Sequence, residues 1–348
     1  MKKNKRISIF IGDISCSGGT ERVASFLANQ FSLLGYDVAV VSMTLNNKEP
    51  YYFLNDSVTC QIIGSISQYA LADFLRNHCC DILISISMGR LSFQLSIIHA
   101  LLRHDSKLIL SEHIAYETSP WWIRTLKQLS YHLADELVLL TQHDRSILDG
   151  KVKANVSVIS NASAFPVQVA DSLEKKNKIV LAVGRLTYQK AFDRLLHIWA
   201  AIDDKNGWEL HIIGDGEDRS KLQKIVDNYA LADTVSLLPA AKNIDTEYAN
   251  ASILAMTSHY EGLPLVLIES KSFGLPAVAF DCKTGPREII SDGVDGFLVL
   301  DGDMDAYKDK LIYLMNSDDE RRNMQLAALS AAERYSPEII IKQWMRLI

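Results

Sequence analysis

The feature that most constrains the fold is an alternation of short runs rich in valine and isoleucine with longer segments of helical period. In the first half, strand-like runs are expected at 7–11, 38–42, 82–86, 107–111, 136–140 and 156–159. Helical spacing is expected from Val23 to a stop at Gly35, and at 71–76, 93–102 and 122–132. This alternation is typical of parallel strands joined by crossover helices. It predicts a doubly wound α/β unit.

The pattern stops and then starts again. Residues 161–178 are polar and include Pro166, which predicts a linker. Further strands are expected at 179–183, 208–213, 235–238, 253–256 and 277–280, with helices at 192–201, 219–229 and 264–273. We therefore expect two Rossmann-like α/β domains facing across a cleft, 1–164 and 165–335. Ligands of such sheets bind beyond the carboxyl ends of the strands, so functional residues are sought in the loops there.

Charge and cysteine content exclude several classes of function. Up to Ala164, 15 Lys and Arg accompany 14 Asp and Glu, and after it 21 accompany 28. A nucleic-acid-binding protein needs a basic surface, so this class is disfavoured. Five cysteines without a CxxC pair suit reduced thiols in a cytoplasmic protein. The run 7–11 is too short for a signal peptide, and no run reaches the ~18 apolar residues of a membrane span.

The most informative segment is 257–270, which contains Glu261, Gly262, Pro264 and Glu269. Proline suits the first turn of a helix, so a helix is expected to begin at Pro264. Gly262 allows backbone N–H groups to approach a ligand, and the helix N-terminus attracts phosphate. The carboxylates beside this anion site suit hydrogen bonds from ribose or sugar hydroxyls. Without further context, both glutamates could equally be surface carboxylates.

Two cations follow another expected strand end. Arg185 and Lys190 lie just after 179–183, on the side where ligands bind. Arginine offers a bidentate fork to phosphate oxygens and lysine a mobile charge. The alternative is two solvated cations or a local pair with Asp193.

Together these motifs resemble the donor-binding half of a GT-B glycosyltransferase. The matching segments are Gly184-Arg185-Leu186 with Lys190, Gly214-Asp215-Gly216, Glu261-Gly262-Leu263-Pro264 with Glu269, and Gly274-Leu275-Pro276. Within this fold the sequence is similar to family four, whose members are retaining enzymes that use nucleotide-sugar donors. The similarity covers nearly the whole chain, and Ser17-Gly18-Gly19-Thr20 matches the family's N-terminal glycine loop.

The resemblance implies a role for each matching residue. Arg185 and Lys190 would hold the diphosphate, Glu269 the ribose hydroxyls, and Glu261 the donor sugar. His113, after the expected strand 107–111, would lie near the transferred sugar, although a lone histidine is more often structural. The implied catalytic residues are Arg185, Lys190, Glu261 and His113. The implied donor-binding residues are Gly18, Gly19, Gly184, Gly214, Gly262, Leu263, Pro264, Leu265 and Glu269.

The expected chemistry needs no metal ion and no cofactor besides the nucleotide sugar. Fixed cations and a helix terminus can stabilise the negative charge of a departing diphosphate. Asp301-Gly302-Asp303 and Asp303-Met304-Asp305 are Asp-x-Asp tripeptides, but they lie in an expected surface loop. The family's relatives further imply UDP as the nucleotide and a glycan acceptor, often lipid-linked, in bacterial surface polysaccharides such as lipopolysaccharide.

Other functions remain as alternatives. A glycoside hydrolase also uses two carboxylates, but it has no use for a phosphate site. Residues 12–19 do not form the GxGxxG fingerprint of an NAD enzyme. A GT-B nucleotide-sugar epimerase and a non-catalytic nucleotide-sugar-binding subunit would both keep the donor site.

Some features carry two interpretations. Trp121 and Trp122 begin an expected helix, and they either join the core or contact a membrane at its inner face. Residues 281–288 either border the donor sugar or form a strand-to-helix connection capped by Glu288. Ala191 stands where the family often has glycine after the lysine. By resemblance, the last helix, 336–348, packs back on the N-terminal domain.

Overall fold

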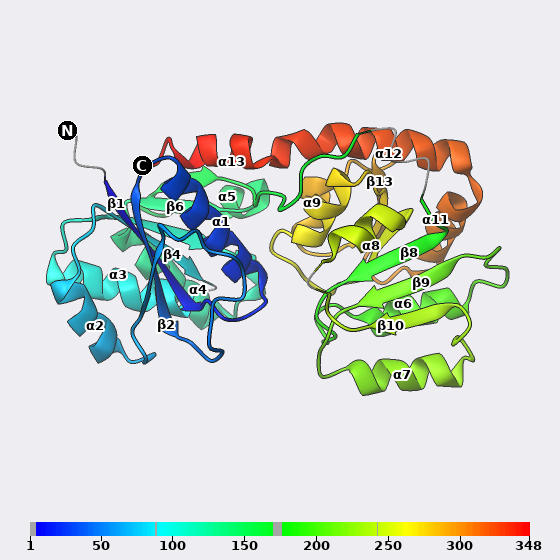
Figure 1. Ribbon diagram of the computed structural model, residues 1–348, viewed down its shortest axis with the longest axis horizontal. Coiled ribbons are helices and arrows are strands. Elements are labelled where there is room, and N and C mark those ends of the chain that lie inside the picture. Colours follow the sequence, from blue (N-terminus) through cyan, green and yellow to red (C-terminus); the bar gives the residue numbers. More distant parts are fainter. Residues whose placement is uncertain (1–4, 88, 170–175, 242) are drawn as a thin grey trace. The chain divides into compact units, whose positions relative to one another are not determined.

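The chain forms two compact units, each built around its own parallel β-sheet (Figure 1). The computed structural model describes residues 5–87, 89–169, 176–241 and 243–348. The first unit comprises Met1–Asn161 and Ile340–Ile348, and the second comprises Ala162–Ile339. The prediction of two Rossmann-like α/β parts is confirmed, since both sheets are parallel and carry helices on both faces.

The first unit has the strand order β3-β2-β1-β4-β5-β6-β7. Its strands are β1 (Arg6–Asp13), β2 (Asp37–Thr44), β3 (Thr59–Ile62), β4 (Ile82–Ser87), β5 (Lys107–Glu112), β6 (Glu136–Leu139) and β7 (Asn155–Val158). The central residues of β1, β2, β4, β5 and β6 are buried, as expected for strands covered by crossover helices, whereas the edge strands β3 and β7 are mostly exposed or half-buried. The strand order reverses between β1 and β4, where ligands of such sheets bind.

Helices cover both faces of this sheet. They are α1 (Gly19–Leu33), α2 (Gln68–Asn77), α3 (Arg90–Leu102), α4 (Trp121–Leu133), α5 (Gln142–Leu148), the 3₁₀ turn η1 (Tyr116–Thr118) and α13 (Pro337–Trp344). Side chains of α2, α3, α4 and α5 share one apolar cluster with the strands. The Trp344 ring packs edge-on against Phe31 of α1, with 6.5 Å between ring centroids, so the chain's last residues belong to the first unit.

The second unit repeats the strand order, as β10-β9-β8-β11-β12-β13. Its strands are β8 (Ile179–Val183), β9 (Glu209–Ile213), β10 (Val235–Leu238), β11 (Ile253–Met256), β12 (Ala277–Asp281) and β13 (Gly296–Leu300). Its helices are α6 (Phe192–Ala200), α7 (Arg219–Asn228), α8 (Asp245–Asn250), α9 (Leu265–Ser272), α10 (Pro286–Ile289), α11 (Met304–Asn316), α12 (Asp318–Ala332) and the 3₁₀ turn η3 (Glu333–Tyr335). Side chains of α6, α7 and α11 share one apolar cluster with the strands.

Several helices and strands were not predicted, and the expected loop at 301–305 differs from the structure. The unpredicted elements are β3, β13, α5, α8, α11 and α12. The expected surface loop around Asp301–Asp305 is a turn as far as Asp303, but α11 begins at Met304, so the loop is shorter than expected. Asp303 is the N-cap of this helix, where its carboxylate accepts a hydrogen bond from the Ala306 N–H at 2.9 Å.

Candidate active site

The loops that follow β8 and β9 interlock, and glycine makes this possible. A Cβ atom on Gly214 would lie 1.9 Å from the carbonyl oxygen of Gly184. A Cβ atom on Gly216 would lie 2.2 Å from the carbonyl oxygen of Leu186, whose N–H donates to Asp215 O at 2.9 Å. Since real side chains do not tolerate such distances, only glycine lets the two loops approach this closely. The predicted Gly184 and Gly214 therefore bring two loops of the expected donor site together.

Two predicted site residues meet in an ion pair. The Lys190 ammonium donates to Glu261 Oε1 at 2.7 Å, although 71 positions separate them in the chain. The aliphatic part of Lys190 runs across Gly184, where an added Cβ would lie 3.1 Å from Lys190 Cε. The exposed fraction is 17% for the Lys190 side chain and 7% for that of Glu261. The alternative of a pair with Asp193 is wrong, because Asp193 binds Lys221 at 2.8 Å.

Arg185 is the second predicted cation of this site. Its side chain is exposed, and across the described parts of the chain its guanidinium forms no hydrogen bond or ion pair. It leaves the sheet directly after Gly184, at the carboxyl end of β8. An arginine held at this place has its full set of donors available for an anion.

The loop before α9 is braced from two sides. The hydroxyl of Thr284 donates to the carbonyl oxygen of Glu261 at 2.6 Å. Gly285, at φ +95°, lies so close that an added Cβ would be 2.7 Å from Gly262 O. On the other side, the Gln189 amide donates to Tyr260 O at 3.1 Å. These contacts hold Gly262, Leu263 and Pro264 in place ahead of the helix.

Helix α9 begins at Leu265, one residue after the expected start, with Pro264 as its N-cap. Pro264 provides no side-chain cap, and the partial positive charge of this helix end suits an anion. Glu269 lies about one turn further along. Its side chain is buried, at 2% exposure, and its Oε2 accepts a hydrogen bond from the Tyr248 hydroxyl at 3.0 Å.

Residues 281–288 run from the end of β12 into α10, with Glu288 in the first turn of that helix. Gly285 is the N-cap of α10, which has no side-chain cap. The connection contacts the backbone of the 261–264 loop, through Thr284 and Gly285. Burial raises the pKa of the Cys282 thiol to about 12, which keeps it protonated and unreactive.

Arg194, which was not identified from the sequence, connects several loops at the carboxyl edge of this sheet. The Arg194 guanidinium donates to Thr257 O at 3.4 Å and binds Asp301 at 2.8 Å, and it lies over the ring of Phe280. Arg194 thereby joins the 257–261 loop to α6 and to the start of α11. Nothing in the sequence linked Arg194 to Thr257 or Asp301, which lie 63 and 107 positions further along the chain.

In the first unit, the predicted residues lie at the carboxyl edge of the sheet. Gly18 is the N-cap of α1 and Gly19 is its first residue. His113 follows β5 directly, and its Nε2 lies 3.1 Å from the Ser111 hydroxyl oxygen. Burial lowers the pKa of His113 to about 4, so the imidazole is neutral at physiological pH. Beside it, Glu112 and Lys127 form a buried ion pair of 2.8 Å.

The two tryptophans at the start of α4 are not part of the core. Trp121 is 78% exposed and Trp122 is 52% exposed. Leu126, Leu129 and Leu133 continue this apolar surface along the helix, at 39%, 46% and 36% exposure. The interpretation of these residues as core is therefore wrong. Among the described helices, none is both long and apolar enough to cross a membrane.

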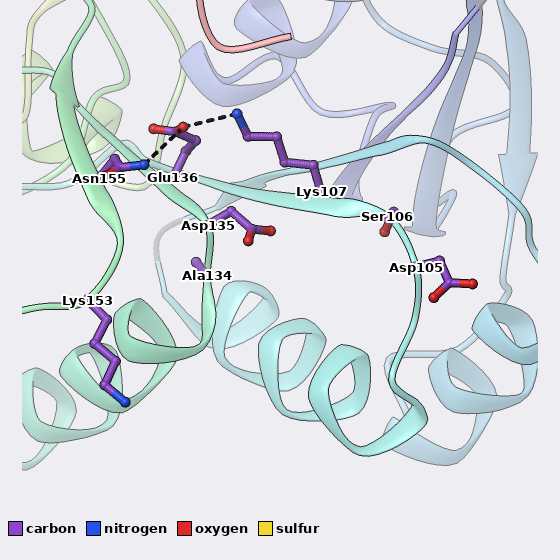
Figure 2. A pocket seen from close by; sticks show the side chains of 8 residues that line it. All are labelled: Asp105, Ser106, Lys107, Ala134, Asp135, Glu136, Lys153 and Asn155. Carbon is purple, nitrogen blue, oxygen red and sulfur yellow. Dashed lines mark hydrogen bonds and ion pairs between the residues drawn. The ribbon is translucent and has the colours of Figure 1, made fainter.

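A cavity of about 620 Å³ lies elsewhere, at the amino ends of β5, β6 and β7 (Figure 2). There the Lys107 ammonium binds Glu136 Oε1 at 3.0 Å, and the Asn155 amide donates to the same oxygen at 3.4 Å. Asp135 accepts from the Leu108 N–H at 2.7 Å. These polar groups bind one another, and the cavity lies at the edge opposite the predicted site.

The strand orders define a two-part α/β protein, and in its second unit Lys190, Glu261 and the start of α9 lie in loops at the carboxyl ends of the strands. The family profile described as "Glycosyl transferases group 1" matches residues 167–330. The amylovoran biosynthesis glycosyltransferase AmsD of Erwinia amylovora is 42% identical, over 97% of this chain and 98% of that protein. The chain therefore belongs to the group 1 glycosyltransferases, as the motifs indicated.

Two further proteins extend the comparison. A Campylobacter jejuni protein is 28% identical over 99% of this chain and 98% of its own length. It is named GalNAc-α-(1→4)-GalNAc-α-(1→3)-diNAcBac-PP-undecaprenol α-1,4-N-acetyl-D-galactosaminyltransferase. The crystal structure of Anabaena HepE with UDP-glucose superposes with a TM-score of 0.82, at 18% identity over 99% of both chains. With such neighbours, the fold is GT-B.

Proposed function

We propose that this glycosyltransferase moves a hexosyl or N-acetylhexosaminyl unit from a UDP-sugar to a glycan acceptor, with retention of configuration. The observation that carries the proposal is the Lys190–Glu261 ion pair, together with Arg185, which has no partner among the described residues, and the N-terminus of α9. HepE, which shares the fold, was crystallised with UDP-glucose, and this supports a UDP-sugar donor.

The proposed chemistry is departure of the nucleoside diphosphate. Arg185 and Lys190 stabilise the negative charge that develops on the diphosphate as the glycosidic bond breaks. Glu261 neutralises Lys190 in this structure, and with donor bound it contacts the sugar hydroxyls. Glu269 accepts hydrogen bonds from the ribose. His113, neutral at physiological pH, donates or accepts one hydrogen bond near the transferred sugar.

We also propose that the reaction is independent of metal ions. Two cations and a helix terminus supply the positive charge that a divalent ion would otherwise bring. The late Asp-x-Asp tripeptides have other roles, because Asp303 caps α11 and Asp301 binds Arg194. Turnover that stops when EDTA is added would contradict this part of the proposal.

For the acceptor, we propose a lipid-linked saccharide used in bacterial surface polysaccharide assembly, at the inner face of the cytoplasmic membrane. The E. amylovora relative is named for amylovoran biosynthesis, and the C. jejuni relative for an undecaprenol-linked acceptor. The exposed α4 surface (Trp121, Trp122, Leu126, Leu129 and Leu133) suits insertion at headgroup level. Neither α3 nor α4 contains an acidic residue, so an anionic membrane would not repel this side.

A donor panel tests the enzymatic proposal. Purified protein is incubated with UDP-, GDP- and ADP-sugars, with and without lipid-linked glycans, and nucleotide release is measured. We expect release that depends on the acceptor, is fastest with one UDP-sugar, and gives a product with the donor's anomeric configuration. Isomerisation of the donor without transfer would indicate the epimerase alternative. Binding without release under every condition would indicate a non-catalytic subunit.

Liposome flotation tests the membrane contact. The chain should float with vesicles that contain anionic lipid, and the Trp121→Ala/Trp122→Ala variant should float several-fold less. The matched control is Phe53→Ala/Tyr69→Ala, which removes two aromatic rings that are 74% and 88% exposed on other parts of the first unit. Equal flotation of all three proteins would refute the contact.

A further inference from the structure

The carboxylate of Glu269 is almost completely buried, which is unusual for a charged group. Its side chain is 2% exposed on α9, within the second unit. A buried carboxylate needs hydrogen bonds to offset the loss of water, and a hydrogen bond to an ionised group is about twice as strong as a neutral one. The Tyr248 hydroxyl supplies such a bond to Oε2 at 3.0 Å. Tyr248 thus fixes one oxygen of the group proposed to bind the ribose.

The Tyr248 ring is itself held firmly. It has no exposed surface, and it stacks on the Phe273 ring with 5.4 Å between centroids and 22° between planes. Phe165 packs edge-on against both rings, at 6.0 Å from Tyr248 and 5.3 Å from Phe273. A tyrosine has two side-chain torsions, and this packing fixes both, so the hydroxyl has a defined position.

The backbone around Tyr248 is also anchored. Helix α8 has six residues, and its last carbonyl groups need partners. The Lys176 ammonium donates to the carbonyl oxygens of Tyr248, Ala249 and Ala251, at 3.1, 3.1 and 2.9 Å. Lys176 comes just before β8, so this contact secures α8 to the central part of the sheet.

We propose that Tyr248 is a positioning residue of the donor site, which holds the Glu269 carboxylate in the orientation that accepts the ribose hydroxyls. The inference rests on the proposed role of Glu269 in donor binding. Tyr248 touches neither the sugar nor the phosphates in this scheme, so it controls how tightly the nucleotide binds and not how fast the bond breaks.

The test compares nucleotides with and without ribose hydroxyls on the Tyr248→Phe variant, which keeps the ring stack. Binding of UDP, GDP and ADP is measured by calorimetry, and the nucleotide that the wild type prefers is used. Tyr248→Phe should raise its Kd about tenfold, the effect of losing one hydrogen bond to a charged group. The 2′,3′-dideoxy form of this nucleotide should bind both proteins equally. Equal weakening of both ligands, or of neither, would overturn the inference.

Two further variants separate the possible failures. Tyr307→Phe also removes a fully buried hydroxyl, which donates to Val278 O at 2.6 Å, and it should lower thermal stability without changing nucleotide affinity. Glu269→Gln should weaken nucleotide binding, and the double variant with Tyr248→Phe should be no weaker than Glu269→Gln alone. Additive losses would overturn the role of Tyr248. Unchanged binding by Glu269→Gln would instead refute the proposed role of Glu269.

Discussion

The two units share a strand order but differ in how the loops at the carboxyl edge of their sheets are held. In the second unit, an added Cβ on Gly214, Gly216 or Gly285 would collide with backbone atoms of a neighbouring loop. In the first unit, an added Cβ would meet side-chain atoms instead: on Gly18, those of Glu21 and Thr20, and on Gly89, those of Lys127. The same topology thus carries one edge whose loops touch backbone to backbone and one edge whose glycines face side chains. The fold determines where a site can lie, and the packing of its loops determines how far the site is preorganised.

The largest effect is expected from Arg185→Ala in the second unit. If this guanidinium meets developing charge, its removal should lower kcat by about a hundredfold to a thousandfold. Because the side chain has no partner in the described structure, thermal stability should stay unchanged. Steady-state nucleotide release and a melting curve measure the two quantities. Lys224→Ala, an exposed cation on α7, is the control, and similar activity of both variants would contradict the assignment.

The second-largest effect is expected from Gly214→Ala, which tests the close contact between the β8 and β9 loops. Gly214→Ala should destabilise the second unit by about 4 kcal/mol, since the methyl group would force the β8 and β9 loops apart. Gly12→Ala is the matched change in the first unit, where nothing lies within 4 Å of an added Cβ, and it should be nearly neutral. Urea unfolding compares the two variants. Equal midpoints would show that the loops relax easily and that the contrast between the units is weaker than described.

A smaller effect concerns His113 at the other edge. Burial lowers its pKa from 6.5 to about 4, so the folded state prefers the neutral imidazole. The stabilisation that this neutral group provides is complete above pH 6.5 and is lost as the pH falls towards 4. We expect wild type to lose more stability between pH 7 and pH 5 than His113→Gln does. His197→Gln, at an exposed histidine, should follow the wild type, and parallel curves for all three would contradict the prediction.

The smallest effect is expected at Ala191, which stands where the family often has glycine. Its φ of 49° and ψ of 45° lie in the left-handed region, which costs a non-glycine residue about 1 kcal/mol. Ala191→Gly should therefore stabilise the protein by up to about 1 kcal/mol, less the loss of a buried methyl group. Ala230→Gly, at an exposed alanine with φ of 51°, isolates the backbone contribution. Thermal unfolding that shows a loss in both variants would contradict this reasoning.

Strands made of apolar runs were the most predictable elements. The expected bounds of β8, β10 and β11 agree with the structure, because a short apolar run between turn residues is typical of a strand. Exposed or short elements were missed: β3 is an edge strand with mostly exposed residues, and α8 has only six. Since α8 was not predicted, nothing in the sequence indicated that Tyr248 contacts Glu269.

The sequence alone determined the chain's class, its two repeated α/β patterns and the residues around which a donor site would form. Those inferences depend on local periodicity and on short motifs, whose signals lie within a few residues of each other. Only the tertiary structure decided that Lys190 pairs with Glu261, that Tyr248 binds Glu269 and that Trp121 faces outward. These facts join residues far apart in the chain or depend on burial, and both are set by how strands and helices pack.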